Sequence, residues 1–114
     1  MYTYGRNNGE NREMEFRFPD EKLQALYTEG KGSEDYPTGL ADVFVRRIRT
    51  VEGASDERDL RALGSLHFEK LKGKKYKGKY SIRLKGQWRL ILRLVKSKAR
   101  TVVEIDEITN HYGD

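Results

Sequence analysis

The 114-residue sequence predicts one α+β domain, with two or three N-terminal helices packed on a twisted antiparallel β-sheet. Two observations predict this class. Before Gly64 the apolar residues recur at helical spacing, whereas after Gly64 they recur at every second position, which is the period of a strand. The length is typical of a single domain. We therefore expect a flexible tail over residues 1–13, which are rich in Gly, Asn and charge, and one domain over residues 14–114.

The first expected elements are a short strand and a helix. Met14–Phe18 alternates apolar and polar residues, which is typical of a strand, and Pro19 ends it. Asp20 can cap the helix that follows, DEKLQALYTEG, and Gly30 can end that helix.

The clearest helix covers the segment from Thr38 to Gly53. Its apolar residues have spacings of 3, 1, 4 and 3 and so share one helix face: Leu40, Val43, Phe44, Ile48 and Val51. Thr38 is a candidate cap and Gly53 a candidate stop. A short helix, DERDLRAL, is expected next, between a cap at Ser55 and a stop at Gly64.

Four strands are expected after the third helix. The alternating apolar residues are Leu66, Phe68 and Leu71; Tyr80, Ile82 and Leu84; Trp88, Leu90, Leu92 and Leu94; and Val103 and Ile105. A three-residue connection at 85–87 pairs Leu84 with Trp88 and keeps the apolar residues of this hairpin on one face. The other face then carries Arg83 opposite Arg89, with Arg93 beyond. Like charges opposite one another cost stability, so we expect an anionic group at this face.

Positive charge is concentrated in one segment of the chain. Residues 70–103 contain thirteen Lys or Arg and no Asp or Glu, whereas the rest contains ten basic and eighteen acidic residues. This asymmetry indicates a binding surface for nucleic acid or another polyanion. The alternative is a Lys-rich sheet edge that protects against aggregation, but here Arg occurs within the strands as well as Lys in the loops.

A phosphate backbone could lie on the predicted arginine face, because Arg holds phosphate through paired hydrogen bonds and Lys supplies point charge. The face consists of Arg83, Arg89 and Arg93, and its rim of Lys70, Lys72, Lys74, Lys75, Lys77 and Lys79. Tyr76, Tyr80 and Tyr112 are candidates for stacking on the bases of single-stranded RNA, and Tyr76, which lies in the loop, is freer than Tyr80. Tyr80 shares the parity of Ile82, so we expect it in the core instead.

Other chemistries have little support in the sequence. The absence of cysteine excludes disulfides and Cys-type zinc sites and fits a cytoplasmic protein. No apolar run approaches the roughly eighteen residues of a membrane span, and MYTYGRNNGENRE lacks the apolar core of a signal peptide. GKKYKGK does not have the spacing of a phosphate-binding P-loop. We expect no cofactor and no metal, because Glu104, Asp106 and Glu107 fit a solvated strand end, and we expect His67 to be an exposed strand residue.

The segment DERDLRALGSLHFEKLKGKKYKGKYSIRLKGQWRLILRL, followed by VVEI, resembles the HigB-like branch of the RelE superfamily, toxins of bacterial toxin–antitoxin modules. The likeness runs from about Glu15 to about Ile105 and is carried by Leu60–Arg61, Phe68–Gly73, Gly78–Arg83, Gln87–Leu90 and Val103–Ile105. It implies the RelE-like fold and a ribosome-dependent, metal-free endoribonuclease, which cuts translated mRNA through attack by the ribose 2′-hydroxyl. It also implies the 70S ribosome, mRNA and a cognate antitoxin, usually with a helix-turn-helix domain, as partners.

The resemblance also implies site residues. Lys72 matches the active-site lysine of the LKG motif, Arg89 the arginine of the QWR motif, and Arg83 the arginine that follows YSI. Glu69 stands where many relatives have His. Three alternatives follow: Glu69 is the general base, a two-residue shift brings His111 to the site, or the site is weakened. The alternative function, known from non-catalytic relatives with this fold, is a poison of DNA gyrase or a protein that only binds RNA.

Overall fold

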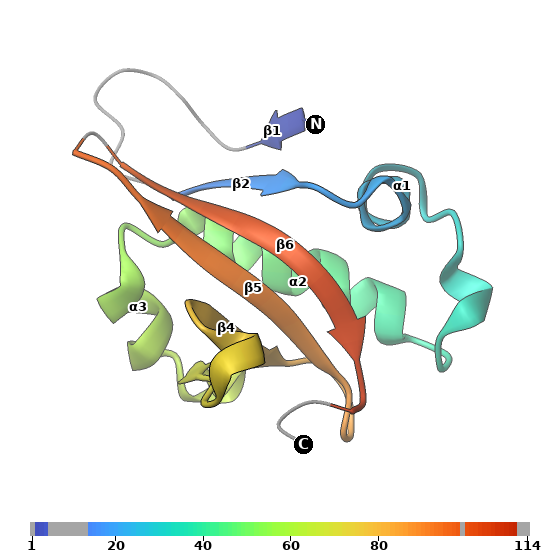
Figure 1. Ribbon diagram of the computed structural model, residues 1–114. Coiled ribbons are helices and arrows are strands. Elements are labelled where there is room, and N and C mark those ends of the chain that lie inside the picture. The colour runs from blue at the N-terminus through green and yellow to red at the C-terminus, as the bar shows by residue number, and fades with distance from the viewer. Residues whose placement is uncertain (1, 5–13, 99, 112–114) are drawn as a thin grey trace.

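The computed structural model describes residues 2–4, 14–98 and 100–111, and within these ranges six strands form one sheet in the order β1-β2-β6-β5-β4-β3 (Figure 1). The strands are β1 Tyr2–Tyr4, β2 Glu15–Phe18, β3 Glu69–Lys70, β4 Lys79–Arg83, β5 Arg89–Lys96 and β6 Thr101–Thr109. The helices are α1 Glu21–Glu29, α2 Leu40–Gly53 and α3 Glu57–Ala62, with 3-10 turns at Ser33–Asp35, Gly64–Leu66 and Lys74–Tyr76. The predicted α+β class, with helices before most of the sheet, is confirmed.

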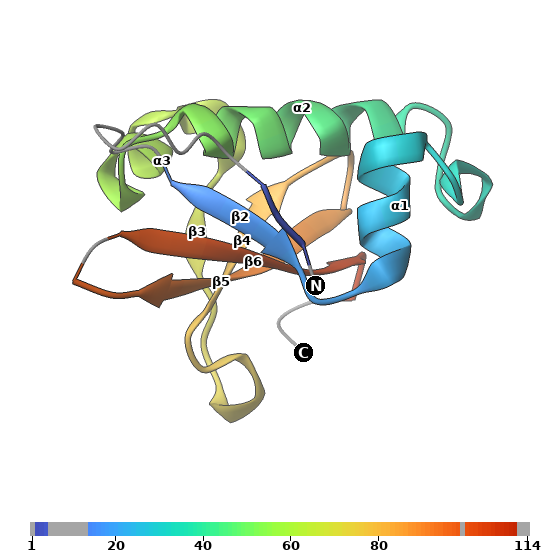
Figure 2. The ribbon, with the colours of Figure 1, turned by 90° about the horizontal axis from the view of Figure 1, so that it is seen from above.

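The helices cover one face of the sheet. Figure 2 shows α2 lying along that face, with α1 beside its N-terminal end and α3 beside its C-terminal end. The segment between β3 and β4 projects from the opposite face in the same view. That opposite face, which carries no helix in the described part of the chain, is therefore the face on which ligands can approach the strands directly. No helix within the described ranges is long and apolar enough to cross a bilayer.

One strand pair departs from the predicted antiparallel sheet. β2 runs parallel to β6, with Phe16 opposite Val103, whereas the other strand pairs are antiparallel. A parallel pair needs a long crossover connection. The three helices and β3 to β5 supply it, because they all lie between β2 and β6 in the chain.

Part of the expected N-terminal tail is a strand. Tyr2–Tyr4 forms β1, which pairs with β2 and places Tyr2 opposite Phe18. The expectation of flexibility at residues 1 and 5–13 falls outside the described residues.

The cap predicted for α1 is confirmed, and those predicted for α2 and α3 are wrong. Asp20 Oδ1 accepts a hydrogen bond from the Lys22 N–H at 2.7 Å. At α2, the residue before the helix is Gly39 in a left-handed conformation (φ 85°), and no side chain caps the helix, so Thr38 does not have the predicted role. At α3, Asp56 rather than Ser55 accepts the hydrogen bonds of the first turn.

The core lies between the helices and the sheet. The predicted apolar stripe of α2 is confirmed, since Leu40, Phe44, Ile48 and Val51 are each 0% exposed and Val43 is half-buried. Burying one such side chain contributes about 1.5–3 kcal/mol. At the end of the core near α1, four aromatic rings pack in edge-on or tilted contacts: Phe16, Phe18, Tyr27 and Phe44.

Candidate nucleic-acid interface and active site

The hairpin of β4 and β5 presents the face that the sequence predicted. Arg83 lies opposite Arg89 in the antiparallel register, and Ile82 lies opposite Leu90. The Leu84 N–H donates to the Trp88 carbonyl at 3.0 Å, which confirms the three-residue connection. The side chains on the helix-free side of this hairpin are called the basic face below, and they are Lys79, Ser81, Arg83, Arg89, Ile91 and Arg93.

The two arginines nearest the turn are held by backbone contacts. Arg89 is half-buried, and its Nη1 donates to the carbonyls of Gly86 at 2.8 Å and Trp88 at 3.1 Å. Arg83 is exposed, and its own carbonyl accepts a hydrogen bond from Arg47 Nε of α2 at 3.1 Å. Partial burial, with Arg46 nearby, lowers the pKa of the Arg47 guanidinium. The guanidinium of Arg83 is therefore presented to solvent by a backbone that α2 supports.

The end of the basic face that lies farthest from the 85–87 turn is less positive than the sequence indicated. The strand β6 lies beside β5 and carries acidic residues, of which Glu104 stands opposite Arg93. Lys79 Nζ contacts Asp106 Oδ2 at 2.6 Å, and Arg17 Nη2 contacts Glu104 Oε2 at 2.6 Å. These carboxylates, which we expected at a solvated strand end, instead pair with cations across the sheet. Of the two, Glu104 lies opposite Arg93, whereas the β6 partner of Arg89 is Thr109. The register therefore places neither carboxylate opposite the facing pair Arg83 and Arg89.

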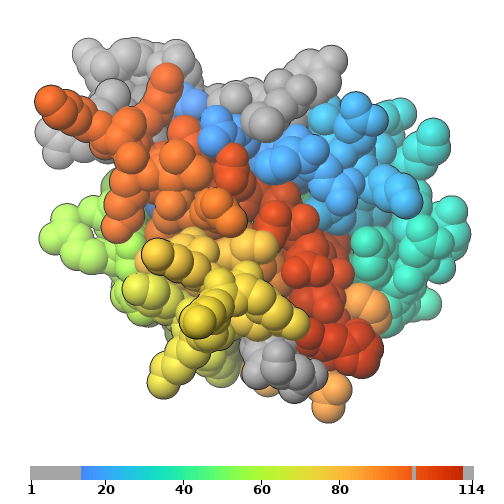
Figure 3. Space-filling view, viewed as in Figure 1, coloured from blue at the N-terminus to red at the C-terminus, as the bar shows by residue number. Residues whose placement is uncertain are grey.

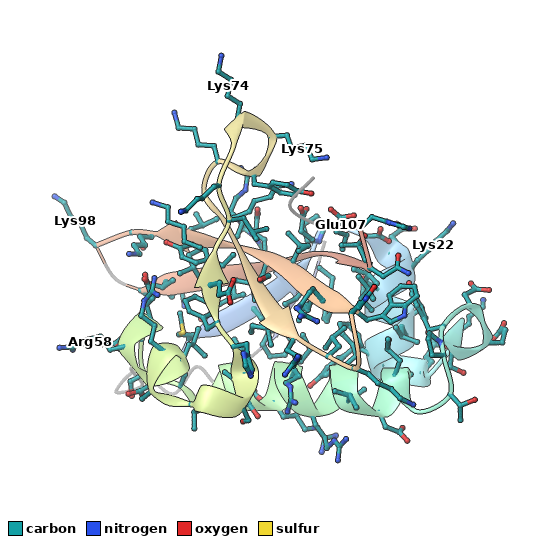
Figure 4. All side chains as sticks on the ribbon, turned by 90° about the horizontal axis from the view of Figure 1, so that it is seen from below. Lys22, Arg58, Lys74, Lys75, Lys98 and Glu107 are labelled. Atoms are coloured by element: carbon teal, nitrogen blue, oxygen red, sulfur yellow. The ribbon has the colours of Figure 1, made fainter. Side chains whose placement is uncertain are left out.

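The segment 72–78, called the lysine loop below, stands over the basic face. Its lysines Lys72, Lys74, Lys75 and Lys77 are all exposed. Figure 4 shows Lys74 and Lys75 at its tip, pointing away from the body of the protein. In the space-filling view the loop covers part of β5 (Figure 3). The loop therefore extends the positive surface outward from the sheet.

Tyr76 is not free to stack on RNA, contrary to the prediction. Its exposed fraction is 6%, because it packs with Leu71 and Ile91 in a small apolar cluster on the helix-free side of the sheet. Ile91 lies between Arg89 and Arg93 on this face of β5, and the Tyr76 ring covers its apolar side chain. Tyr80 is half-buried against the core, as expected, and stacks on Phe68 at 5.0 Å between ring centroids. Tyr112 falls outside the described residues.

The remaining predicted residues occupy different places. Glu69 is exposed and lies opposite Ser81, so it faces the same side as the basic face. Lys70 lies opposite Tyr80, which puts it on the helix side of β3 and away from the arginines, contrary to the predicted rim. Lys72 is exposed at the base of the lysine loop. His111 is exposed just after β6, two residues beyond Thr109, the strand partner of Arg89.

His67 is a residue that the sequence reasoning did not place beside the arginines. It is exposed, as expected, but it lies in a turn rather than a strand, and its Nε2 is 3.3 Å from Arg83 Nη1. The register of the β3–β4 pair accounts for this contact. If Glu69 lies opposite Ser81, then continuing the antiparallel count places position 67 opposite Arg83. The structure therefore brings together His67, Arg83 and Arg89 on one side of the sheet.

Comparison with known proteins gives the following matches. The family model described as "RelE-like toxin of type II toxin-antitoxin system HigB" matches residues 16–107. The protein named "Toxin HigB-1" of Vibrio cholerae serotype O1 is 33% identical over 86 residues, which make up 75% of this chain and 90% of that protein. The family match includes the whole basic face and the lysine loop.

Proposed function

Because the chain belongs to the HigB family of RelE-like toxins of type II toxin–antitoxin systems, we propose that it is a ribosome-dependent endoribonuclease that cuts translated mRNA. The observation that carries the proposal is the opposed pair Arg83 and Arg89 on a helix-free face, from which a loop of exposed lysines also projects (Figure 2). Phosphoryl chemistry needs fixed positive groups directed at charge that develops in the transition state. Guanidinium groups provide them with paired donors.

In the proposed reaction the ribose 2′-hydroxyl attacks the adjacent phosphorus. Arg83 and Arg89 hold the nonbridging phosphate oxygens and stabilise the charge that builds on them. Lys72 and the other lysines of the loop hold the flanking backbone. A 2′-hydroxyl is present only in RNA, so this chemistry selects RNA over DNA. Glu69 and His111 are the general-base candidates that the sequence provides.

A type II toxin implies a cognate antitoxin as a partner. We propose that the antitoxin carries a helix-turn-helix domain and that an acidic segment of it covers the basic face and the lysine loop. Such a segment would compete with RNA for Arg83 and Lys72. Mixing the toxin with its antitoxin should therefore suppress both RNA binding and growth arrest.

The test is cleavage of a defined mRNA in a purified translation system, with and without ribosomes and in the presence of EDTA. We expect cuts only in ribosome-bound message, unaffected by chelation. Arg89→Ala and Lys72→Ala should abolish the cuts and relieve growth arrest. The matched controls are Arg49→Ala on α2 and Lys22→Ala on α1, exposed cations away from the basic face, which remove the same charges. Equal loss from the control variants would contradict the assigned site.

The ion pair of Lys79 with Asp106 reduces the positive charge at one end of the basic face, which favours keeping a non-catalytic alternative. In that case the protein would poison DNA gyrase or only bind RNA. A supercoiling assay separates the two functions, because a gyrase poison stabilises cleaved DNA and a ribonuclease leaves DNA intact. Intact mRNA together with trapped DNA breaks would replace the proposal.

A further inference from the structure

The residue His67 has an unusual backbone conformation. With φ 47° and ψ 50°, it is the only residue other than glycine with a positive φ among those described. The left-handed region is disfavoured for residues with a Cβ atom, although His adopts it more often than most. Such a conformation persists where the surrounding structure imposes it, and an observed outlier is grounds for a functional hypothesis.

Two buried neighbours impose this conformation on His67. Leu66, 1% exposed, and Phe68, 8% exposed, are both part of the main core. The His67 N–H also donates to the Gly64 carbonyl at 3.2 Å, which closes the turn. Leu66 and Phe68 therefore hold the turn to the core. The turn directs the His67 side chain outward, next to Arg83.

The contact with Arg83 places a cationic donor against the His67 ring. Arg83 Nη1 lies 3.3 Å from His67 Nε2. A guanidinium has only donors, so this contact is a hydrogen bond in the tautomer whose Nε2 carries the lone pair. A phosphate oxygen is a stronger acceptor than a neutral imidazole, because its hydrogen bond to Arg is charge-assisted on both sides. When a phosphate binds Arg83, the lone pair of Nε2 is therefore released beside that phosphate.

We propose that His67 is the general base of the reaction, a role that rests on the proposed endoribonuclease function. The 2′-hydroxyl is attached to the same ribose as the 3′-phosphate held by Arg83, so it comes within reach of Nε2. As the 2′-oxygen bonds to phosphorus, its proton passes to Nε2. The bond between phosphorus and the 5′-oxygen breaks, and that oxygen takes a proton from solvent. A 2′,3′-cyclic phosphate and a 5′-hydroxyl result, and His67 returns its proton to solvent.

The charges around His67 favour it over Glu69 as the base. Arg83 of β4 contacts it, and Arg89 of β5 lies opposite Arg83. Glu69 of β3 faces the same side but lies opposite Ser81, two residues from Arg83 along β4. A carboxylate also adds negative charge beside the phosphate, whereas a neutral imidazole does not. His67 thus takes a role for which the sequence offered Glu69 or His111.

The left-handed backbone makes a sharp experiment possible. His67→Gly places in the turn the residue that adopts this conformation most readily, so the fold is kept and the imidazole is deleted. The matched control is Ser65→Gly, which introduces glycine at an exposed position of the same turn. His67→Asn is a second variant that tolerates the conformation but is not a base. Single-turnover cleavage of ribosome-bound mRNA is measured with and without added imidazole, alongside thermal unfolding and RNA affinity.

We expect His67→Gly and His67→Asn to cleave about 100-fold more slowly than the parent, within the usual contribution of a general base. RNA affinity should stay within about twofold, since the phosphate-binding cations are unchanged. Imidazole should restore cleavage to His67→Gly and not accelerate the parent, and Ser65→Gly should match the parent.

Three results would overturn the assignment. If the parent cleaves and His67→Gly cleaves equally, only the role of His67 fails and the endoribonuclease function stands. If His111→Gly instead loses activity and responds to imidazole, His111 is the base. If the parent cleaves no mRNA, the proposed function fails and the role of His67 with it.

Discussion

The small cluster of Tyr76, Leu71 and Ile91 is the apolar contact between the lysine loop and the sheet. Replacing Tyr76 with alanine removes the ring that covers Ile91, which is itself 0% exposed. The substitution changes no charge on the loop. The substitution therefore tests whether packing of Tyr76 fixes the position of the lysine loop, without changing its lysines.

The size of the effect can be worked out from burial. A buried aromatic side chain removes about 150–250 Å² from water, which at about 25 cal/mol per Å² corresponds to about 4–6 kcal/mol. Alanine keeps part of this area, and the denatured chain already buries some of it. The loop can also open locally without unfolding the domain, which limits the global effect. We expect Tyr76→Ala to lower the free energy of unfolding by about 2–3 kcal/mol.

The assay is urea denaturation together with amide hydrogen exchange, and the control is Lys75→Ala. Lys75 Nζ lies 5.1 Å from the Tyr76 ring centroid, an interaction worth about 0.5–1 kcal/mol at an exposed site. Lys75→Ala should therefore cost less than about 1 kcal/mol. The Leu71 N–H, which donates to the Lys79 carbonyl at 3.0 Å at the base of the loop, should exchange faster in Tyr76→Ala only.

The packing and stacking roles of Tyr76 predict opposite results. If Tyr76 anchors the loop, stability falls and RNA affinity falls with it, because the lysines lose their fixed positions. If Tyr76 instead stacked on RNA bases, affinity would fall while stability and Leu71 exchange stayed unchanged. The second pattern would refute the argument from burial.

Further predictions concern charge and helix caps. Burial raises the pKa of Glu57, but hydrogen bonds from Arg61 and Lys96 outweigh it, so the net pKa is lowered. Its contribution to stability is then present above the unfolded pKa of about 4.3 and lost as pH falls through the folded value. Glu57→Gln should flatten the loss of stability between about pH 5 and about pH 3, measured by urea denaturation. Asp106→Asn removes the ion-pair partner of Lys79, so we expect tighter binding of single-stranded RNA. A plot of the logarithm of the binding constant against the logarithm of the salt concentration should become steeper by about 0.7. An unchanged slope would contradict this prediction. Asp20→Ala should cost about 1 kcal/mol because it removes the cap of α1, while Thr38→Ala should change stability by less than about 0.5 kcal/mol; a reversed order in thermal unfolding would contradict the assigned caps.

The parts of the fold that depend on periodicity could be predicted from the sequence. The stripe of α2 and the register of the β4–β5 hairpin follow from one requirement, that the apolar residues of an element share a face. Arg83 was placed opposite Arg89 for the same reason. The parallel pairing of β2 with β6 could not be found in this way, because periodicity describes each strand and says nothing about which strands become neighbours.

The parts of the site that depend on contacts between distant segments were missed. A charge balance along the chain assigns the carboxylates of β6 to a different region from the basic segment, although β6 pairs with β5 in space. The sequence predicts a free Tyr76 because it does not show that the lysine loop folds back onto the sheet. A signal was present, since Ile91 shares its face with Arg89 and Arg93 and needed an apolar cover.

The neighbourhood of β2 and β6 has a consequence for the order in which the protein can form during synthesis. Phe16 is made early and its strand partner Val103 very late, and the ion pair of Arg17 with Glu104 joins residues 87 positions apart. Pairings this distant along the chain form slowly, because a long loop must close first. In a nascent chain that has not yet reached Thr101, the edges of β2 and β5 that later pair with β6 are unpaired. Such open edges favour misassembly. The completed molecule, and with it any activity of the basic face, should therefore appear only after the last strand has been translated.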